Sequence, residues 1–194
     1  MNDTKKMSTK KLAWIGLMAA LVFIGTFMRI KIPVGGDSTM LHLGNVFCIL
    51  SGLLLGGVPG GLAAGLGSAI FDLSSEYASE FWITFINKFA MGWMAGWLCW
   101  SVFPKLGKFK PDGLFKPTLA SIAGSLTYTA LYVIKSIITS RYVTGLPWEA
   151  VWPVVAVKFS VSLINGLIAV VVSLVLYFAL KPALAKAHLM IPTE

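Results

Sequence analysis

Apolar residues are concentrated in six stretches of the chain, which are separated by short segments rich in glycine, proline or charge. The stretches are Leu12–Met28, Leu41–Leu55, Pro59–Leu73, Phe81–Phe103, Pro117–Thr139 and Pro153–Leu180. A helix needs about 20 mostly apolar residues to cross a bilayer. The pattern predicts an all-α integral membrane protein with six transmembrane helices, of which the second and third are short.

The boundary between the second and third helices lies inside a long uncharged run. Ser38–Phe71 contains no Asp, Glu, Lys or Arg, and the Gly-rich segment Gly56–Gly61 interrupts it. Such a cluster of glycines around Pro59 breaks a helix. We therefore expect two helices joined by a tight hairpin, and a turn-rich segment over Ile30–Thr39 before them.

Composition agrees with a membrane protein. Hydrophobic residues make up 57% of the chain and charged residues 12%, about half the charged fraction of soluble domains. We expect one transmembrane domain over residues 12–180, between a basic N-terminus, residues 1–11, and a tail, residues 181–194.

The net charge of +8 comes mainly from lysines beside the apolar stretches. The N-terminus, the segment after the fourth stretch (Lys105, Lys108, Lys110 and Lys116) and the tail (Lys181 and Lys186) hold most of them. The intervening loops hold Arg29, Lys31 and Arg141. Cytoplasmic loops are enriched in Lys and Arg, so we expect both termini in the cytoplasm.

Three lysines stand alone inside the apolar stretches, namely Lys88, Lys135 and Lys158. A cation inside a membrane costs about 2.5–3.5 kcal/mol on insertion scales. With the expected topology, each lysine lies roughly 6–11 Å below the outer end of its helix. We therefore expect all three to face one outward-facing polar chamber that binds a small polar molecule. The alternative is that they extend to the outer headgroups.

Further polar and aromatic side chains share a helix face with these lysines or open a neighbouring helix. They are Thr84 beside Lys88, Tyr128 and Tyr132 beside Lys135, Asn165 beside Lys158, Asp72 in the third helix and Asn45 in the second. Such a set is typical of a small-ligand site. Hydrogen bonding between helices would also explain single members, and Asp72 could instead neutralise a lysine.

Small residues form a separate pattern on the first helix. Ala13, Gly16 and Ala20 lie on one face, which allows another helix to approach closely. The partner could be a helix of another protein or of this chain.

Motifs for catalysis or metal binding are lacking. The sequence has no Walker A motif, no His-x-x-x-His pair and no Cys-x-x-Cys pair. We therefore expect no enzyme activity, no cofactor and no metal. A stand-alone secondary transporter remains an alternative, although such proteins usually carry intramembrane acids or an inverted repeat.

Three stretches resemble the substrate-binding S components of energy-coupling factor (ECF) vitamin transporters, in the group of riboflavin, hydroxymethylpyrimidine and pyridoxine carriers. The stretches are Met40–Asn45 (MLHLGN), Leu53–Leu73 (LLLGGVPGGLAAGLGSAIFDL) and Thr84–Gly92 (TFINKFAMG). The last adds Asn87 to the candidate binding residues. The resemblance covers roughly residues 12–180.

The resemblance implies a multi-pass subunit in a bacterial plasma membrane that binds a vitamin on the outside. A transmembrane T component and two ATPase subunits would drive uptake. The face formed by Ala13, Gly16 and Ala20 would contact the T component, and Gly35–Leu41 would cap the ligand.

The charges and the resemblance favour different vitamins. Three lysines against Asp72 favour an anionic or electron-rich ligand such as pantothenate or a flavin. The resemblance places pyridoxine or hydroxymethylpyrimidine first and riboflavin second. Pyridoxine and hydroxymethylpyrimidine are both small heteroaromatic molecules that could stack on Tyr128, Tyr132, Trp82 or Trp152.

Overall fold

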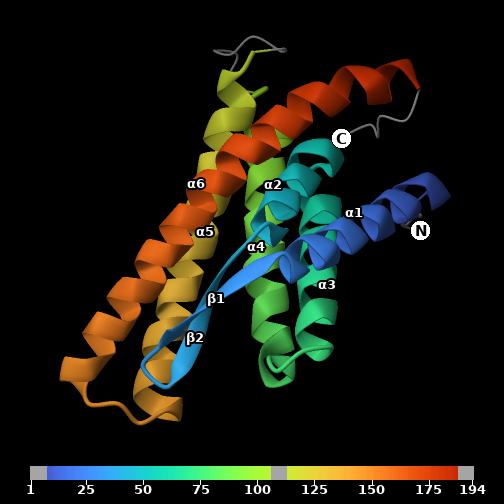
Figure 1. Ribbon diagram of the computed structural model, residues 1–194. Helices are drawn as coiled ribbons and strands as arrows, with labels where there is room; N and C mark the ends of the chain where they lie inside the picture. Colours follow the sequence, from blue (N-terminus) through green and yellow to red (C-terminus); the bar gives the residue numbers. More distant parts are fainter. Residues whose placement is uncertain (1–7, 106–112, 188–194) are drawn as a thin grey trace, which may run out of the picture.

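The computed structural model describes residues 8–105 and 113–187, which form a bundle of six α-helices and one β-hairpin (Figure 1). The helices are α1 Thr9–Phe27, α2 Gly44–Leu55, α3 Gly57–Leu73, α4 Phe81–Trp97, α5 Phe115–Ile138 and α6 Trp148–Lys186. The strands are β1 Arg29–Val34 and β2 Asp37–His42. Three short helical segments complete the described residues. η1 Ala78–Glu80 is a 3-10 helix, and η2 Leu98–Val102 and η3 Thr139–Val143 are π-helical.

The prediction of six helices is confirmed. Thr9–Phe27, Phe115–Val143 and Trp148–Lys186 are long and apolar enough to cross a membrane, and α2 and α3 are shorter apolar helices. The 39 residues of α6 exceed a hydrocarbon core of about 30 Å at about 1.5 Å per residue. A helix of this length has to tilt or extend beyond the hydrocarbon core, and Figure 1 shows α6 running obliquely across the bundle.

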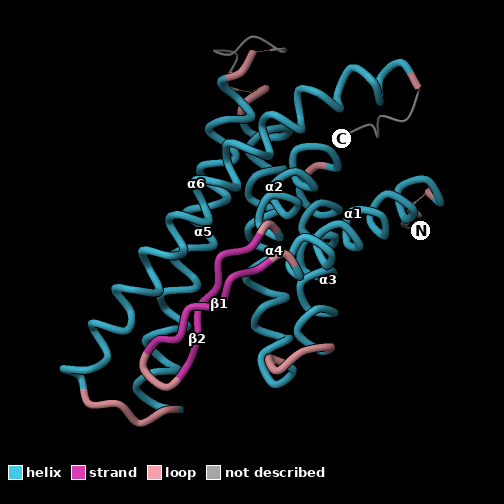
Figure 2. The backbone as a smooth tube through the Cα atoms, viewed as in Figure 1, coloured by secondary structure: helices cyan, strands magenta, loops and turns pink. Residues whose placement is uncertain are grey.

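The predicted turn-rich segment is instead an antiparallel hairpin, with Arg29 opposite His42 and Val34 opposite Asp37. Gly35 and Gly36 form its tip with φ of 55° and 79°, the conformation that a tight two-residue hairpin requires. Figure 2 shows the hairpin in one half of the bundle and α2 continuing from it into the other half. The end of the bundle that carries the hairpin tip is called the hairpin end below.

Glycines bring α2, α3 and α4 into close contact. A Cβ on Gly52 would lie 2.3 Å from the carbonyl oxygen of Gly92, and one on Gly96 would lie 2.4 Å from the carbonyl carbon of Gly56. The Ser51 hydroxyl donates to the carbonyl oxygen of Gly60 over 2.8 Å. These contacts make the three helices one tightly packed unit.

Gly52→Ala is therefore expected to destabilise the protein. Overpacking a close contact costs about 1–3 kcal/mol, and the nearest neighbour here is backbone that cannot rotate away. The control is Gly16→Ala, because nothing lies within 4 Å of a Cβ at Gly16. Thermal unfolding in detergent should show a lower midpoint for Gly52→Ala alone, and equal midpoints for both variants would contradict this packing.

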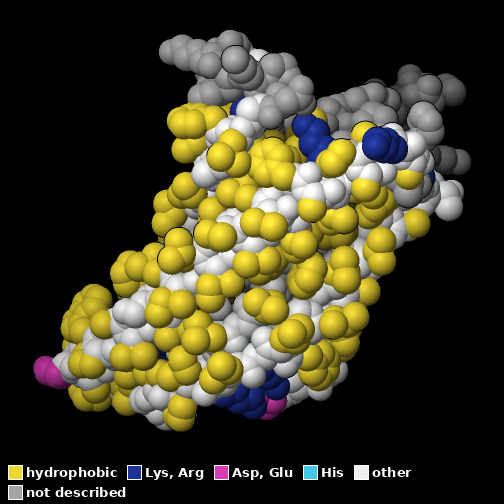
Figure 3. Space-filling view, turned by 45° about the horizontal axis from the view of Figure 1, so that its top comes forward, with side chains coloured by type: hydrophobic (Ala, Val, Ile, Leu, Met, Phe, Trp, Pro, Cys, Tyr) yellow, Lys and Arg dark blue, Asp and Glu magenta, His cyan; other side chains and the backbone are white. Residues whose placement is uncertain are grey.

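Apolar and polar residues separate along the bundle axis. The buried apolar core joins α1 and α2 to the parts of α3–α6 farthest from the hairpin tip, from Met18 and Leu53 to Ala169 and Tyr177. The buried side chains of Asp72, Asn87 and Lys88 lie toward the hairpin end, whereas the buried Lys116 lies in the first turn of α5. In Figure 3 hydrophobic side chains cover most of the visible face, and charged ones gather near its edges, as expected of a protein surrounded by lipid.

Candidate functional site

A cavity lies beneath the hairpin, between β2 and the ends of α3, α4 and α5. Seven of the predicted residues line it: Asp72, Thr84, Asn87, Lys88, Tyr128, Tyr132 and Lys135. The space open to the centres of water-sized molecules is about 90 Å³, several times the ~10–15 Å³ that one water needs. The tertiary structure thus brings most of the predicted set to one hollow.

Lys88 is the most deeply placed cation in the cavity wall. Its side chain is 5% exposed, its ammonium donates to Oδ1 of Asn45, and it lies 3.9 Å from the centre of the Tyr128 ring. Asn45 itself is fully buried and lies behind the cavity wall, where its Nδ2 lacks a hydrogen-bond partner among the described residues. Asn45 therefore holds Lys88 in place and does not line the cavity.

An ion pair fixes a second lysine on the wall. Lys135 donates to Glu80 over 2.7 Å, and Asp72 forms no ion pair with any described residue. The suggested neutralisation of a lysine by direct pairing with Asp72 is therefore not the arrangement found. The partner of Lys135 is Glu80, from the short helix η1.

Lys158, which the sequence groups with the other two lysines, does not line this cavity. Lys158 is 1% exposed, forms an ion pair with Asp37 at the hairpin tip, and is not among the lining residues. The cause is the hairpin, which places a carboxylate between α6 and the cavity. Asp37 and Lys158 are 121 residues apart in the chain, so local spacing in the sequence does not indicate that they pair.

The Asp37 carboxylate remains charged in this pair. Burial raises its pKa, but hydrogen bonds from Lys158 and from the backbone N–H of Ser38 outweigh burial and lower the pKa below its ordinary value. A carboxyl with a lowered pKa stabilises the fold above its ordinary pKa, and that stabilisation is lost as pH falls through the lowered value. The attachment of the hairpin tip to α6 therefore persists at neutral pH.

Asn165 lies near Lys158 on α6 and has a structural position. Its Oδ1 accepts from the backbone N–H of His42 over 3.0 Å, and its Nδ2 donates to the carbonyl oxygen of Met40 over 2.6 Å. It does not line the cavity. Asn165 thus attaches β2 to α6.

Two of the aromatic side chains on the wall come from α5, and Phe71 and Tyr77 come from α3 and the segment after it. Tyr128 and Tyr132 stack with ring centres 5.7 Å apart, and the Tyr132 hydroxyl donates to Thr39 over 3.1 Å. Trp82 and Trp152, the other predicted stacking platforms, are 56% and 57% exposed and do not line the cavity. Among the aromatic side chains that line the cavity, Tyr128 and Tyr132 form a stacked pair.

Several lining residues were not predicted as binding residues. They include Asp37, Ser38, Thr39, Tyr77 and Glu80, which come from β2 and from the segment after α3. A signal for the hairpin is present in the sequence: two short runs on either side of Gly35-Gly36, a glycine pair that is typical of a two-residue hairpin turn. Residues 37–40 of the segment Gly35–Leu41, which the resemblance gives as a cap, line part of the cavity.

The small-residue face of α1 is open. Ala13, Gly16 and Ala20 are all exposed, so this chain does not use them for internal packing.

Lys108, Lys110 and most of the predicted terminal segments, residues 1–7 and 188–194, lie outside the described residues. Within the described parts, no group of three or more His, Cys, Asp or Glu is placed to hold a metal ion.

The sequence model of the ECF-type riboflavin transporter S component family matches residues 6–182. The chain belongs to this family. Among solved structures it is similar to the S component of a bacterial ECF transporter, with a TM-score of 0.56 and 15% identity over 93% of this chain and 98% of that chain. At this identity the likeness shows the fold alone. No curated protein matches the chain.

Family membership confirms the resemblance drawn from the Gly-rich segment that joins α2 to α3 and from the stretch Thr84–Gly92. An S component is the substrate-binding membrane subunit of a vitamin-uptake system, so this chain is a transporter subunit. The cavity beneath the hairpin is the candidate place for the substrate of this S component.

Proposed function

We propose that this S component binds riboflavin in the cavity beneath the hairpin and delivers it to an ECF module. The observation that carries the proposal is the match to the riboflavin S component family over residues 6–182. It moves riboflavin ahead of pyridoxine and hydroxymethylpyrimidine, which the sequence resemblance placed first. The stacked pair Tyr128 and Tyr132 offers an aromatic surface for a flat ring system.

The charge of the cavity supports a neutral ligand. Lys88 and Lys135 face Asp37, Asp72 and Glu80 on the lining, and Lys135 is paired with Glu80. The expectation of an anionic ligand assumed three lysines against one acid, but the structure adds two carboxylates and pairs two of the lysines. This balance argues against pantothenate, since like charges disfavour a carboxylate ligand.

Pyridoxine and hydroxymethylpyrimidine are the second candidates. The observation that favours them is the modest room in the cavity, about 90 Å³ by the measure above. Both are small neutral heteroaromatic molecules that suit the same tyrosines. Riboflavin would require the hairpin or nearby side chains to shift outward.

Uptake requires partners that supply energy. The sequence has no Walker A motif, and the family name implies an ECF module with a T component and ATPase subunits. We propose that the chain spans the bacterial plasma membrane several times with both termini in the cytoplasm. The excess of lysines on the side of the termini supports this orientation.

Riboflavin is expected to copurify with the protein or to bind it in a detergent titration, with pyridoxine and hydroxymethylpyrimidine weaker and pantothenate undetectable. Mass spectrometry of the released small molecule identifies the ligand, and quenching of riboflavin fluorescence measures its affinity. Tight binding of pantothenate would overturn the neutral-ligand argument. Vitamin uptake by cells that contain the S component but lack the ATPase subunits would instead favour a stand-alone transporter.

A further inference from the structure

The hairpin forms one wall of the cavity, so a ligand that comes from the hairpin end has to pass one of its edges. Asp37, Ser38, Thr39, Met40 and His42 of β2 all line the cavity. One edge of the hairpin faces α6, and the other faces residues 76–80, between α3 and α4. The contacts at these two edges differ in kind and in burial.

Buried contacts hold the α6 edge. Asn165 binds the β2 backbone at both Met40 and His42, and Lys158 pairs with Asp37. Asn165 and Lys158 are 6% and 1% exposed. Leaving such buried polar groups without partners costs far more than separating exposed ones, so this edge resists opening.

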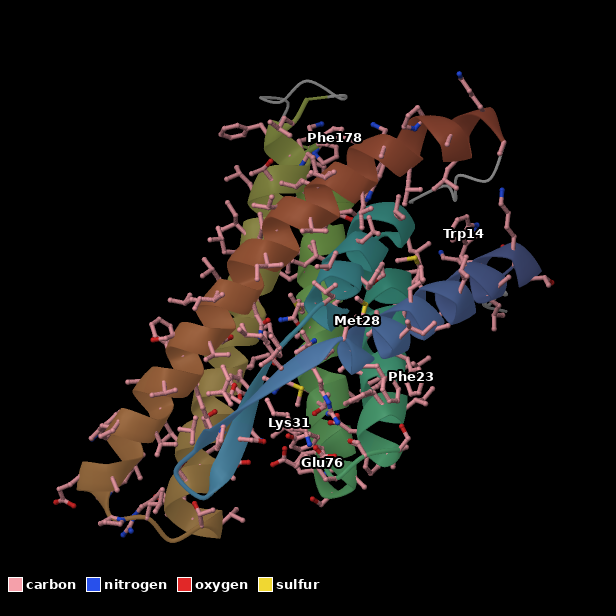
Figure 4. All side chains as sticks on the ribbon, in the orientation of Figure 1. Trp14, Phe23, Met28, Lys31, Glu76 and Phe178 are labelled. Atoms are coloured by element: carbon pink, nitrogen blue, oxygen red, sulfur yellow. The ribbon has the colours of Figure 1, made fainter. Side chains whose placement is uncertain are left out.

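Contacts at the edge facing residues 76–80 involve side chains alone and are more exposed. The Ser38 and Tyr77 hydroxyl groups hydrogen-bond over 2.6 Å. Lys31 and Arg29 both pair with Glu76; the side chains of Lys31 and Glu76 are 47% exposed, and that of Arg29 is 16% exposed. Figure 4 shows Lys31 and Glu76 next to one another at this edge. Exposed ion pairs contribute little to stability, so this is the weaker edge.

A second hollow lies outside the weaker edge. Its lining includes Lys31 and Glu76, and it shares Asp37, Ser38, Tyr77 and Glu80 with the cavity. It offers about 340 Å³ to the centres of water-sized molecules, more than the cavity itself. The hydrogen bond between Ser38 and Tyr77 therefore joins two residues of the wall between the outer hollow and the cavity.

We propose that the ligand reaches the cavity through this outer hollow, and that the Ser38–Tyr77 hydrogen bond closes the passage. The hairpin stays attached to α6 through Asn165 and Lys158 and opens away from residues 76–80. This inference rests on the proposed function only in taking the cavity as the binding site. It assigns Tyr77 and Ser38 as gating residues.

A matched pair of tyrosine variants tests whether the contact with residues 76–80 closes the passage, because Tyr77 and Tyr132 of α5 each bond one of two adjacent hairpin residues, Ser38 and Thr39. Tyr77→Phe and Tyr132→Phe each remove one hydroxyl and keep the ring. Both are made in an Asn87→Cys background, since Asn87 lines the cavity. Without ligand, the rate at which a small water-soluble methanethiosulfonate modifies Cys at position 87 reports opening.

The expected result is that Tyr77→Phe raises the modification rate about three- to tenfold, as loss of one hydrogen bond implies, and that Tyr132→Phe changes it less than twofold. Ser38→Ala tests the same bond from the hairpin and should match Tyr77→Phe. The wild-type chain gives the blank, because Cys48 and Cys99 are buried. An equal or larger effect of Tyr132→Phe, or no effect of both Tyr77→Phe and Ser38→Ala, overturns the proposal.

Riboflavin kinetics provide a second measurement. In Tyr77→Phe, association and dissociation of riboflavin should both accelerate, because loss of the bond lowers the barrier to passage in both directions. A loss of affinity through slower association alone would contradict a gate. If riboflavin does not bind the wild type at all, the riboflavin assignment fails, whereas the cysteine modification rates still decide the route.

Discussion

Lys88→Met should weaken ligand binding by roughly 10- to 150-fold, the range that corresponds to losing one charge-assisted hydrogen bond of about 1.5–3 kcal/mol. Lys88 is held by Asn45 and by the face of Tyr128, so its ammonium is fixed on the cavity wall. A fixed donor loses little conformational entropy when it binds an acceptor on a ligand. Titration of riboflavin into the detergent-purified protein measures the change.

Lys116→Met is the matched control for this substitution. Lys116 is also a buried lysine, 8% exposed, but it lies in the first turn of α5 and does not line the cavity. Lys88→Met leaves the side-chain oxygen of Asn45 without its donor, so a lower melting temperature is expected for this variant. Unchanged affinity in a folded Lys88→Met protein would move the binding site away from α4.

Gly16→Trp should leave ligand binding unchanged and reduce uptake roughly tenfold or more, because a bulky side chain keeps a partner helix from close approach. Nothing lies within 4 Å of a Cβ at Gly16, and Ala13 and Ala20 on the same face are exposed. The isolated chain can therefore accommodate the indole. Uptake of radiolabelled vitamin is measured in cells, and binding is measured on protein purified from the same cells.

Leu126→Trp is the control for an added tryptophan on an exposed helix face. Leu126 lies on α5 and is 53% exposed, away from the small-residue face of α1. Uptake by this variant should equal that of the wild type. Wild-type uptake by Gly16→Trp would remove the α1 face from the contact with the T component.

Sequence reasoning located the cavity better than it located individual contacts. Helical spacing grouped Thr84 with Lys88 and Tyr128 with Tyr132, and all four line the cavity, because residues four apart on a helix share a face whatever the tertiary structure. The same reasoning grouped Lys158 and Asn165, and neither lines the cavity. Both lie on the predicted helix, but β2 crosses in front of them and takes their hydrogen bonds.

The hydrophobic pattern by itself determined the six helices, their order and the membrane class, because the cost of unpaired backbone groups in lipid leaves helices as the simplest way to cross it. The tertiary structure alone decided which charges meet. Asp37 and Lys158 are 121 residues apart in the chain, and Glu80 and Lys135 are 55 apart. Pairs at such separations depend on how the hairpin and the helices pack together, and no local spacing rule encodes that arrangement.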